Sequence, residues 1–237
     1  KTIAKKSEIS VEVMNESDVR KMGMQAFLAV TRGSSEAAKF IKLTYKGSSK
    51  KKIVLAGKAI TFDTGGLSLK DAKNMESMKL DMSGGAAILG LFKVLPYFKP
   101  RSTVIGLIAA CENMPGSKAA KPGDVVTALN GKSIEILNTD AEGRLTLADV
   151  LSYAVLEKPD TIIDLATLTG SCMVALGEEI AGLFSNNTEL AQDIKKAAER
   201  AGEKVWEMPM EKDYKDLIKS EIADLRNISK TSYGGSI

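Results

Sequence analysis

Short apolar runs rich in β-branched residues alternate with longer amphipathic runs along this chain. The short runs predict strands at 41–45, 52–56, 103–109, 133–137, 161–166 and 180–185. The longer runs predict helices at 17–29, 78–95, 145–157, 188–201 and 211–219, and two prolines and two glycines predict an ordered loop at 112–124. This alternation is typical of an α/β protein with a largely parallel sheet.

Composition limits the classes of protein that remain open. The 237 residues are 44% hydrophobic and 27% charged, which is typical of a soluble globular protein with one large core. No apolar stretch is long enough to span a bilayer, and no apolar segment of a signal peptide follows residues 1–6. The only two cysteines, Cys111 and Cys172, favour a reducing, cytoplasmic location. A net charge of +3 gives no indication of nucleic-acid binding.

The ends of the chain predict a longer polypeptide. The sequence begins without Met, and a glycine turn at 233–237 leads into what resembles the start of another element.

The chain contains no histidine. A Ser-His-Asp triad, a Cys-His pair and a zinc site with histidine ligands are therefore excluded within it. Catalysis must rest on carboxylates, lysine, arginine, hydroxyl groups or water activated by metal ions.

Four carboxylates, each at the end of a predicted strand or beside glycine, form the candidate site: Asp63, Asp81, Asp140 and Glu142. Open α/β sheets place their functional groups at such positions. Taken singly, each of these features is more often an ordinary turn or a solvated pair.

Lys58 stands in the apolar run 56–60, five residues before Asp63. A buried lysine is costly unless it is neutral or paired, and beside divalent ions its neutral amine can become a ligand. Two divalent ions would also balance the four carboxylate charges. Oxygen ligands with one nitrogen suit Mn²⁺, Mg²⁺ or Zn²⁺.

Residues 138–145, Asn-Thr-Asp-Ala-Glu-Gly-Arg-Leu, match the signature of the leucyl (cytosol) aminopeptidase family, the M17 metallopeptidases. Four further blocks resemble the family in the same order, at 57–70, 111–115, 121–126 and 166–170. The resemblance implies a three-layer α/β/α fold of the zinc-exopeptidase type with a mixed, largely parallel sheet. It also implies that residues 1–237 form one catalytic domain and lack an N-terminal domain and a C-terminal end.

Position by position, the resemblance assigns roles to named residues. The tight metal site would use Lys58, Asp63, Asp81 and Glu142, and the exchangeable site Asp63, Asp140 and Glu142. Lys70 and Arg144 take the places of the catalytic residues that bind no metal, with bicarbonate held at Arg144. The substrate positions are Met78, Thr167, Leu168 and Gly170, although core packing is an equally good interpretation of Met78.

The resemblance implies a two-metal aminopeptidase that removes leucine-like residues from the N-termini of peptides. Its ions would be zinc or manganese, with magnesium or cobalt as alternatives, and its assembly a homohexamer. Two other functions stay open. A two-metal phosphoesterase is disfavoured by the lysine at a ligand position, and the DNA-binding or scaffolding role of some bacterial family members is not decided by this chain.

Overall fold

The computed structural model describes residues 8–231 of the chain. It divides into two compact units. The larger comprises Lys1–Thr167 with Ser220–Asn227, and the smaller comprises Leu168–Lys219 with Ile228–Ile237. The prediction that residues 1–237 form a single catalytic domain stays a prediction.

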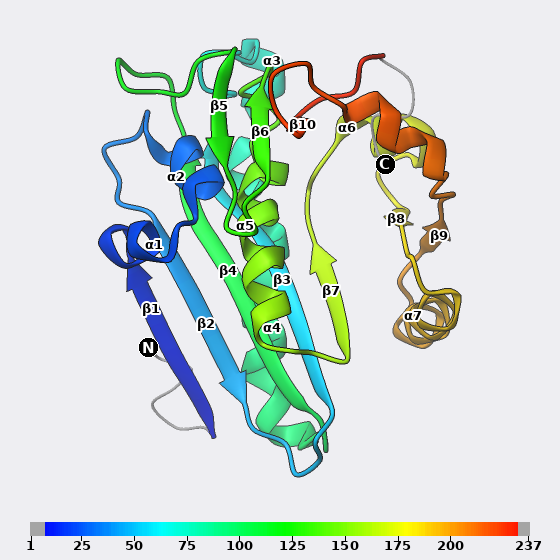
Figure 1. Ribbon diagram of the computed structural model, residues 1–237. Coiled ribbons are helices and arrows are strands. Elements are labelled where there is room, and N and C mark those ends of the chain that lie inside the picture. Colours follow the sequence, from blue (N-terminus) through cyan, green and yellow to red (C-terminus); the bar gives the residue numbers. More distant parts are fainter. Residues whose placement is uncertain (1–7, 232–237) are drawn as a thin grey trace. The chain divides into compact units, whose positions relative to one another are not determined.

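The larger unit is built on a five-stranded sheet in the order β1-β2-β4-β3-β7 (Figure 1). These strands are β1 (Ile9–Asn15), β2 (Lys39–Tyr45), β3 (Lys52–Asp63), β4 (Thr103–Asn113) and β7 (Thr161–Leu165). The sheet is mixed, because β3 is parallel to β4 and β7 whereas β2 is antiparallel to β1 and β4. The carboxyl ends of β3 and β4 meet, with Asp63 opposite Asn113. The candidate site lies at this end.

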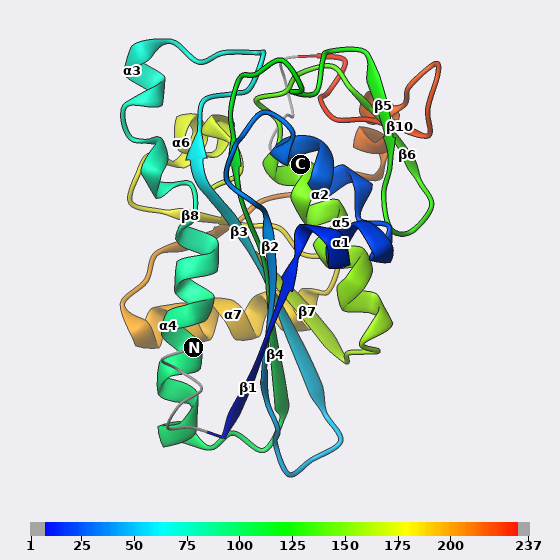
Figure 2. The same cartoon turned by 90° about the vertical axis from the view of Figure 1, so that its left-hand side faces the viewer.

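Helices cover both faces of this sheet (Figure 2). On one face α4 (Ser83–Phe98) contributes Ile88 and Phe92 to an apolar cluster. On the other face lie α1 (Glu16–Met22), α2 (Gln25–Thr31) and α5 (Gly143–Leu156), with Phe27 and Val150 in a second cluster. The expected three-layer α/β/α arrangement is confirmed.

Several element boundaries differ from the predicted ones. The helix expected at 17–29 is two helices, because Gly23 ends α1 with φ at 84°. The helix expected at 78–95 starts as a separate 3₁₀ turn, η2 (Met78–Leu80), before α4 begins. The expected loop at 112–124 is shorter, because β4 ends at Asn113 and a new strand begins at Asp124.

The larger unit also contains a short helix, α3 (Ala72–Met75), and a three-stranded sheet. Its strands are β5 (Asp124–Thr127), β6 (Ser133–Ile136) and β10 (Leu225–Arg226), with β6 antiparallel to β5 and parallel to β10. Strand β10 belongs to the segment Ser220–Asn227, which follows most of the smaller unit in sequence.

The smaller unit contains α6 (Gly170–Leu176), β8 (Ala181–Leu183), α7 (Thr188–Ala201), β9 (Val205–Glu207) and a 3₁₀ helix, η3 (Lys212–Ile218). Strands β8 and β9 form a parallel pair. Over residues 8–231, no helix combines the length and the apolar character needed to cross a bilayer.

Candidate metal centre

Strand β3 and the start of α4 bring Lys58 beside Asp81. The helix packs closely on the strand because Gly84 and Gly85 carry no side chain. A Cβ atom at Gly84 would lie 2.0 Å from the carbonyl oxygen of Leu165, and one at Gly85 would lie 2.9 Å from the Cβ of Ala59. This close approach places Asp81, just before the helix, against the middle of β3.

Lys58 is only 3% exposed, and three oxygen atoms surround its amine. Nζ lies 2.7 Å from Asp81 Oδ1, 2.8 Å from Glu142 Oε1 and 2.9 Å from the carbonyl oxygen of Thr167. The side chain is also confined from one side, since a Cβ atom at Gly143 would lie 2.5 Å from Lys58 Cε. The first residue of α5 therefore has to be glycine for Lys58 to keep this position.

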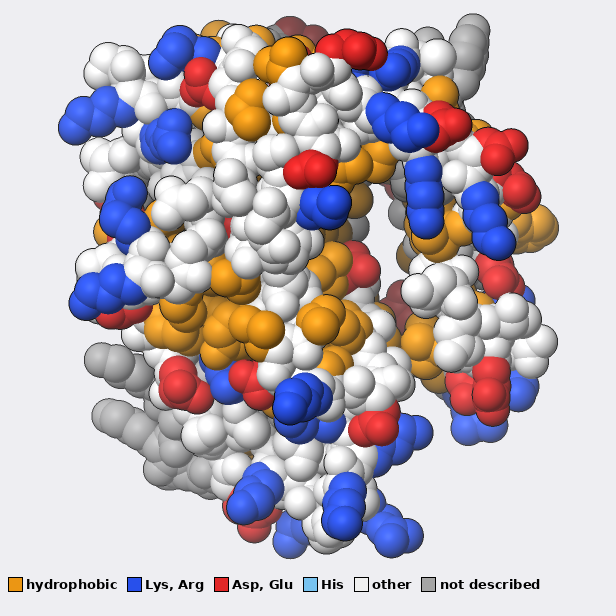
Figure 3. All heavy atoms as spheres, in the orientation of Figure 1, with side chains coloured by type: hydrophobic (Ala, Val, Ile, Leu, Met, Phe, Trp, Pro, Cys, Tyr) orange, Lys and Arg blue, Asp and Glu red, His pale blue; other side chains and the backbone are white. Residues whose placement is uncertain are grey.

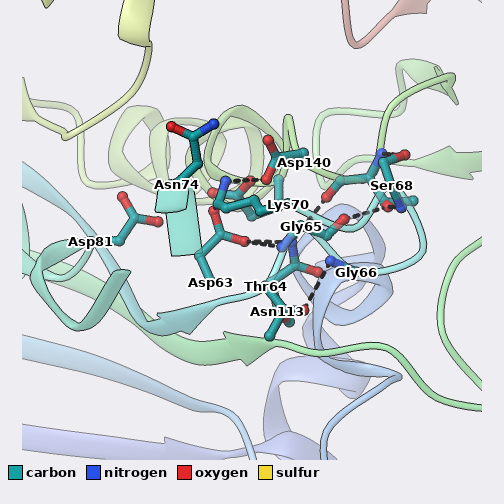
Figure 4. A network of polar contacts seen from close by, with 12 residues as sticks. Asp63, Thr64, Gly65, Gly66, Ser68, Lys70, Asn74, Asp81, Asn113 and Asp140 are labelled. Atoms are coloured by element: carbon teal, nitrogen blue, oxygen red, sulfur yellow. Dashed lines mark hydrogen bonds and ion pairs between the residues drawn. The ribbon is translucent and has the colours of Figure 1, made fainter. Parts of the chain in front are cut away.

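Lys70 joins the other two carboxylates (Figure 4). Its amine lies 2.9 Å from Asp63 Oδ2 and forms a second ion pair with Asp140 Oδ1. The other oxygen of Asp63, Oδ1, accepts hydrogen bonds from the Gly65 backbone at 2.9 Å and from Asn113 Nδ2 at 2.8 Å. Asp63 is thus fixed through Oδ1 and presents Oδ2 to the site.

The oxygens of Asp63, Asp140 and Glu142 form a cluster that a divalent ion fits. One carboxylate oxygen from each residue lies within 4.8 Å of the others. Beside this cluster, Asp81 Oδ2 is buried and has no hydrogen-bond partner among residues 8–231. A buried carboxylate oxygen without a partner is costly, and a cation would satisfy it.

Burial and charge act against each other throughout this cluster. Burial raises the pKa of Glu142 to about 7, although the nearby Lys58 charge opposes the shift. Burial also raises the pKa of Asp81 and Asp140, again against the effect of the lysines. Burial would lower the pKa of Lys58, but the charges of Glu142 and Asp81 outweigh it, so the net shift is upward. Four carboxylates face two lysines here, and the surplus of negative charge favours binding of cations.

Arg144 lies one residue into α5 and is partly buried. Its Nε is buried without a hydrogen-bond partner in the described part of the chain. Burial lowers the pKa of Arg144, and the charge of Glu142 opposes this effect. A guanidinium with a free donor is a suitable group to hold a small anion.

The expected substrate residues fall in different places. Thr167 Oγ1 donates a hydrogen bond of 2.7 Å to Asp81 Oδ1, which places Thr167 in the centre. Met78 lies in η2, half-buried and outside both apolar clusters, so core packing does not account for it. Leu168 and Gly170 belong to the smaller unit, where both are exposed.

Two buried asparagines that support the centre were not predicted as site residues. Asn113 lies within the matched block 111–115, which is the signal that could have identified it. Its Nδ2 donates to Asp63 and, at 3.0 Å, to the carbonyl oxygen of Thr139. Asn227 lies far from every matched block, and no sequence pattern marks it.

The chain is similar to known proteins over nearly its whole length. Residues 1–237 match the family described as the cytosol aminopeptidase family, catalytic domain. Probable cytosol aminopeptidases of Polaromonas naphthalenivorans and Alkaliphilus oremlandii are each 50% identical to the chain, over 100% and 98% of its length. That of Prochlorococcus marinus (strain MIT 9215) is 53% identical over 99%. The alignments cover 47%, 47% and 49% of these relatives, so the chain spans about half of their length. By this match the chain belongs to the cytosol aminopeptidase family.

Proposed function

We propose that the protein is a two-metal aminopeptidase that removes single residues, preferably leucine-like ones, from the N-termini of peptides. The observation that carries the proposal is the buried cluster of Asp63, Asp140 and Glu142 beside the Lys58–Asp81 pair. Histidine-free clusters of this kind suit divalent ions with oxygen ligands. The relatives of this chain, which are about twice as long, are named probable cytosol aminopeptidases.

Two groups of residues would hold the ions. One is Lys58, Asp63, Asp81 and Glu142, and the other is Asp63, Asp140 and Glu142. Two divalent ions, zinc or manganese with magnesium or cobalt as alternatives, would supply an activated water and polarise the scissile carbonyl. The proposal makes Lys58 a neutral ligand, its proton being given up when the ions bind.

The remaining steps fall to residues that bind no metal. The Lys70 amine, already positioned against Asp63 and Asp140, would donate to the substrate carbonyl oxygen as negative charge develops there. Arg144, whose Nε has no hydrogen-bond partner among residues 8–231, would hold a bicarbonate ion, which would supply a group for proton transfer to the leaving amine. Met78 and Thr167 are assigned to the side-chain pocket. The assignment of Leu168 and Gly170 rests on the sequence resemblance alone.

Homohexameric assembly and a cytoplasmic location are also part of the proposal and rest on the family resemblance. The phosphoesterase and DNA-binding alternatives gain no support from the relatives' names. Figure 3 shows acidic as well as basic side chains spread over the face that it draws.

A direct assay separates the two enzyme functions. The full-length protein is incubated with leucine p-nitroanilide and, separately, with p-nitrophenyl phosphate, each with and without Mn²⁺. We expect Mn²⁺-dependent release of nitroaniline and no hydrolysis of the phosphoester. Hydrolysis of the phosphoester alone would contradict the proposal and favour the alternative.

Lys70 and Arg144 provide a test that separates chemistry from metal binding. Lys70→Ala is expected to lower kcat by about 10²-fold, the usual effect of removing one donor to a developing oxyanion. Arg144→Ala should lower kcat less and abolish any stimulation by bicarbonate. Both variants should keep the metal content of the wild type, measured by elemental analysis. A wild-type response of Arg144→Ala to bicarbonate would disprove the anion-holding role.

A further inference from the structure

Asn227 is a buried residue whose side-chain groups all bond to one loop of the larger unit. Its Oδ1 accepts hydrogen bonds from the backbone N–H of Leu137 at 2.8 Å and of Asn138 at 3.3 Å. Its Nδ2 donates to the carbonyl oxygens of Asn138 at 2.6 Å and of Ala141 at 3.3 Å. The residue is 3% exposed, so water does not compete for these bonds.

The loop that Asn227 holds, residues 137–142, is the one that carries Asp140 and Glu142. Strand β6 ends at Ile136 and α5 begins at Gly143, so neither a sheet nor a helix fixes the backbone between them. One backbone hydrogen bond lies within the loop, from the N–H of Ala141 to the carbonyl oxygen of Asn138 at 3.2 Å, and side-chain hydrogen bonds supply further constraints. Asn227 supplies bonds at both ends of the loop, before Asp140 and directly before Glu142.

Asn227 is placed by the short strand that precedes it. In β10, Leu225 pairs with Ile134 and Arg226 with Glu135 of β6 (Figure 1). Just before that strand, Asp224 accepts hydrogen bonds from Ser133 N at 2.9 Å and Ser133 Oγ at 2.8 Å. The backbone N–H of Asn227 then donates to the Glu135 carbonyl at 2.9 Å. The pairing of β10 with β6 thus places the Asn227 side chain beside the loop that follows β6.

We propose that Asn227 is a positioning residue for the metal centre, which fixes the loop 137–142 and through it the carboxylates of Asp140 and Glu142. The proposal rests on the proposed function, because it assumes that these carboxylates bind the ions. Residues that hold metal ligands in place contribute about 10- to 100-fold to metal affinity. A displacement of about 1 Å at a reacting centre can also cost about 10²-fold in rate.

The chemistry of the contacts requires an amide. Two N–H groups and two carbonyl groups of the loop face the side chain, and only an amide both accepts and donates in this arrangement. Asn227→Asp keeps the shape and the two accepted bonds but turns a carboxylate oxygen toward the carbonyls of Asn138 and Ala141. Asn227→Ala removes all four bonds.

The test uses the full-length protein with Asn227→Ala, Asn227→Asp and the control Asp224→Ala. The control alters the same segment, because it removes the two bonds that the Asp224 carboxylate accepts from Ser133. It leaves the pairing of β10 with β6 intact, and Asp224 makes no hydrogen bond to residues 137–142. Mn²⁺ affinity is measured by calorimetry on the folded, metal-free proteins. Deuterium uptake is followed in a peptide that covers residues 137–142, and kcat and KM are measured at saturating Mn²⁺.

We expect both Asn227 variants to bind Mn²⁺ about 10- to 100-fold more weakly than the wild type and to exchange faster at 137–142. At saturating Mn²⁺ their kcat should fall while KM changes little. Asp224→Ala should stay within about threefold of the wild type in Mn²⁺ affinity. If Asn227→Ala does not fold, the more conservative Asn227→Asp carries the test.

Wild-type Mn²⁺ affinity in the Asn227 variants, or an equal loss of affinity in Asp224→Ala, would overturn the positioning role. A failure of the proposed peptidase function would give a different result from a failure of the positioning role. A wild-type protein that hydrolyses no aminoacyl substrate would refute the peptidase proposal, whereas Mn²⁺ affinity and deuterium uptake would still decide the role of Asn227. A wild type that binds no Mn²⁺ would overturn both.

Discussion

Exhaustive chelation is expected to reduce hydrolysis of leucine p-nitroanilide by the full-length protein to background, and Mn²⁺, Co²⁺ or Zn²⁺ is expected to restore it. The physical reason is that in the proposed mechanism the ions activate the water, and the carboxylates that could otherwise act as bases, Asp63, Asp140 and Glu142 among them, bind those ions. The chain contains no histidine, and the amines of Lys58 and Lys70 are held in ion pairs with carboxylates. Water attack on an amide without a metal ion or a general base is slow.

Metal removal must be separated from unfolding. An ion that binds only the folded state stabilises it, by about 2.7 kcal/mol at a concentration 100 times its Kd, so the apo protein should melt at a lower temperature. Circular dichroism at the assay temperature checks that the apo protein is still folded, and elemental analysis checks that its metal content is near zero. Full turnover under those two conditions would contradict the two-metal mechanism.

The sequence predicted most reliably what local patterns determine. Helix α7 has the predicted bounds, 188–201, because Asn187 caps its first turn and Gly202 ends it. The alternation of strands and helices likewise predicted the layered fold. The candidate carboxylates could be found because strand ends and neighbouring glycines mark them, and the structure brings Asp63, Asp140 and Glu142 together.

Contacts between distant residues explain what the sequence did not predict. Gly23 ends α1, but the start of α2 is stabilised by Asp149, whose Oδ2 accepts a 2.8 Å hydrogen bond from the N–H of Phe27 in the first turn of α2, 122 residues away. A carboxylate at a helix N-terminus stabilises that end, but only the fold shows that it comes from α5. Strand β1, an edge strand, was missed although Ile9, Val11 and Val13 alternate with polar residues, which is a local pattern that predicts a strand.

Asn227, which supports the centre, was not predicted for the same reason, because its contacts are with residues distant in the sequence. Asn227 lies about 90 residues from the loop that it holds, and an isolated asparagine carries no pattern of its own.

The pairing partners of Lys58 and Lys70 could not be predicted from the sequence either. Both lysines could be recognised as unusual or matched to a family, but only the structure shows that Lys58 pairs with Asp81 and Glu142 and Lys70 with Asp63 and Asp140.

Lys58→Arg is expected to lower kcat/KM by about 10³-fold or more, although it keeps the positive charge. Arginine is longer and has no amine that can become neutral and bind metal. Lys58 already touches the space that a Cβ atom at Gly143 would fill, so a guanidinium cannot take its place without moving α5. The estimate combines about 10²-fold for misplaced groups with about 10-fold or more for weaker metal binding.

Gly143→Ala and Lys42→Arg make the prediction specific. Gly143→Ala leaves every donor in place but pushes a methyl group against Lys58 Cε, so it should likewise lower kcat/KM and weaken metal binding. Lys42→Arg alters a lysine that is ion-paired with Glu157 at 2.6 Å outside the centre, and it should keep wild-type kcat/KM. Metal content is measured for all three variants with melting temperature as the check on folding. Wild-type metal content and activity in Lys58→Arg would show that the Lys58 amine is only a counter-ion to Asp81 and Glu142, and its assignment as a ligand would have to be withdrawn.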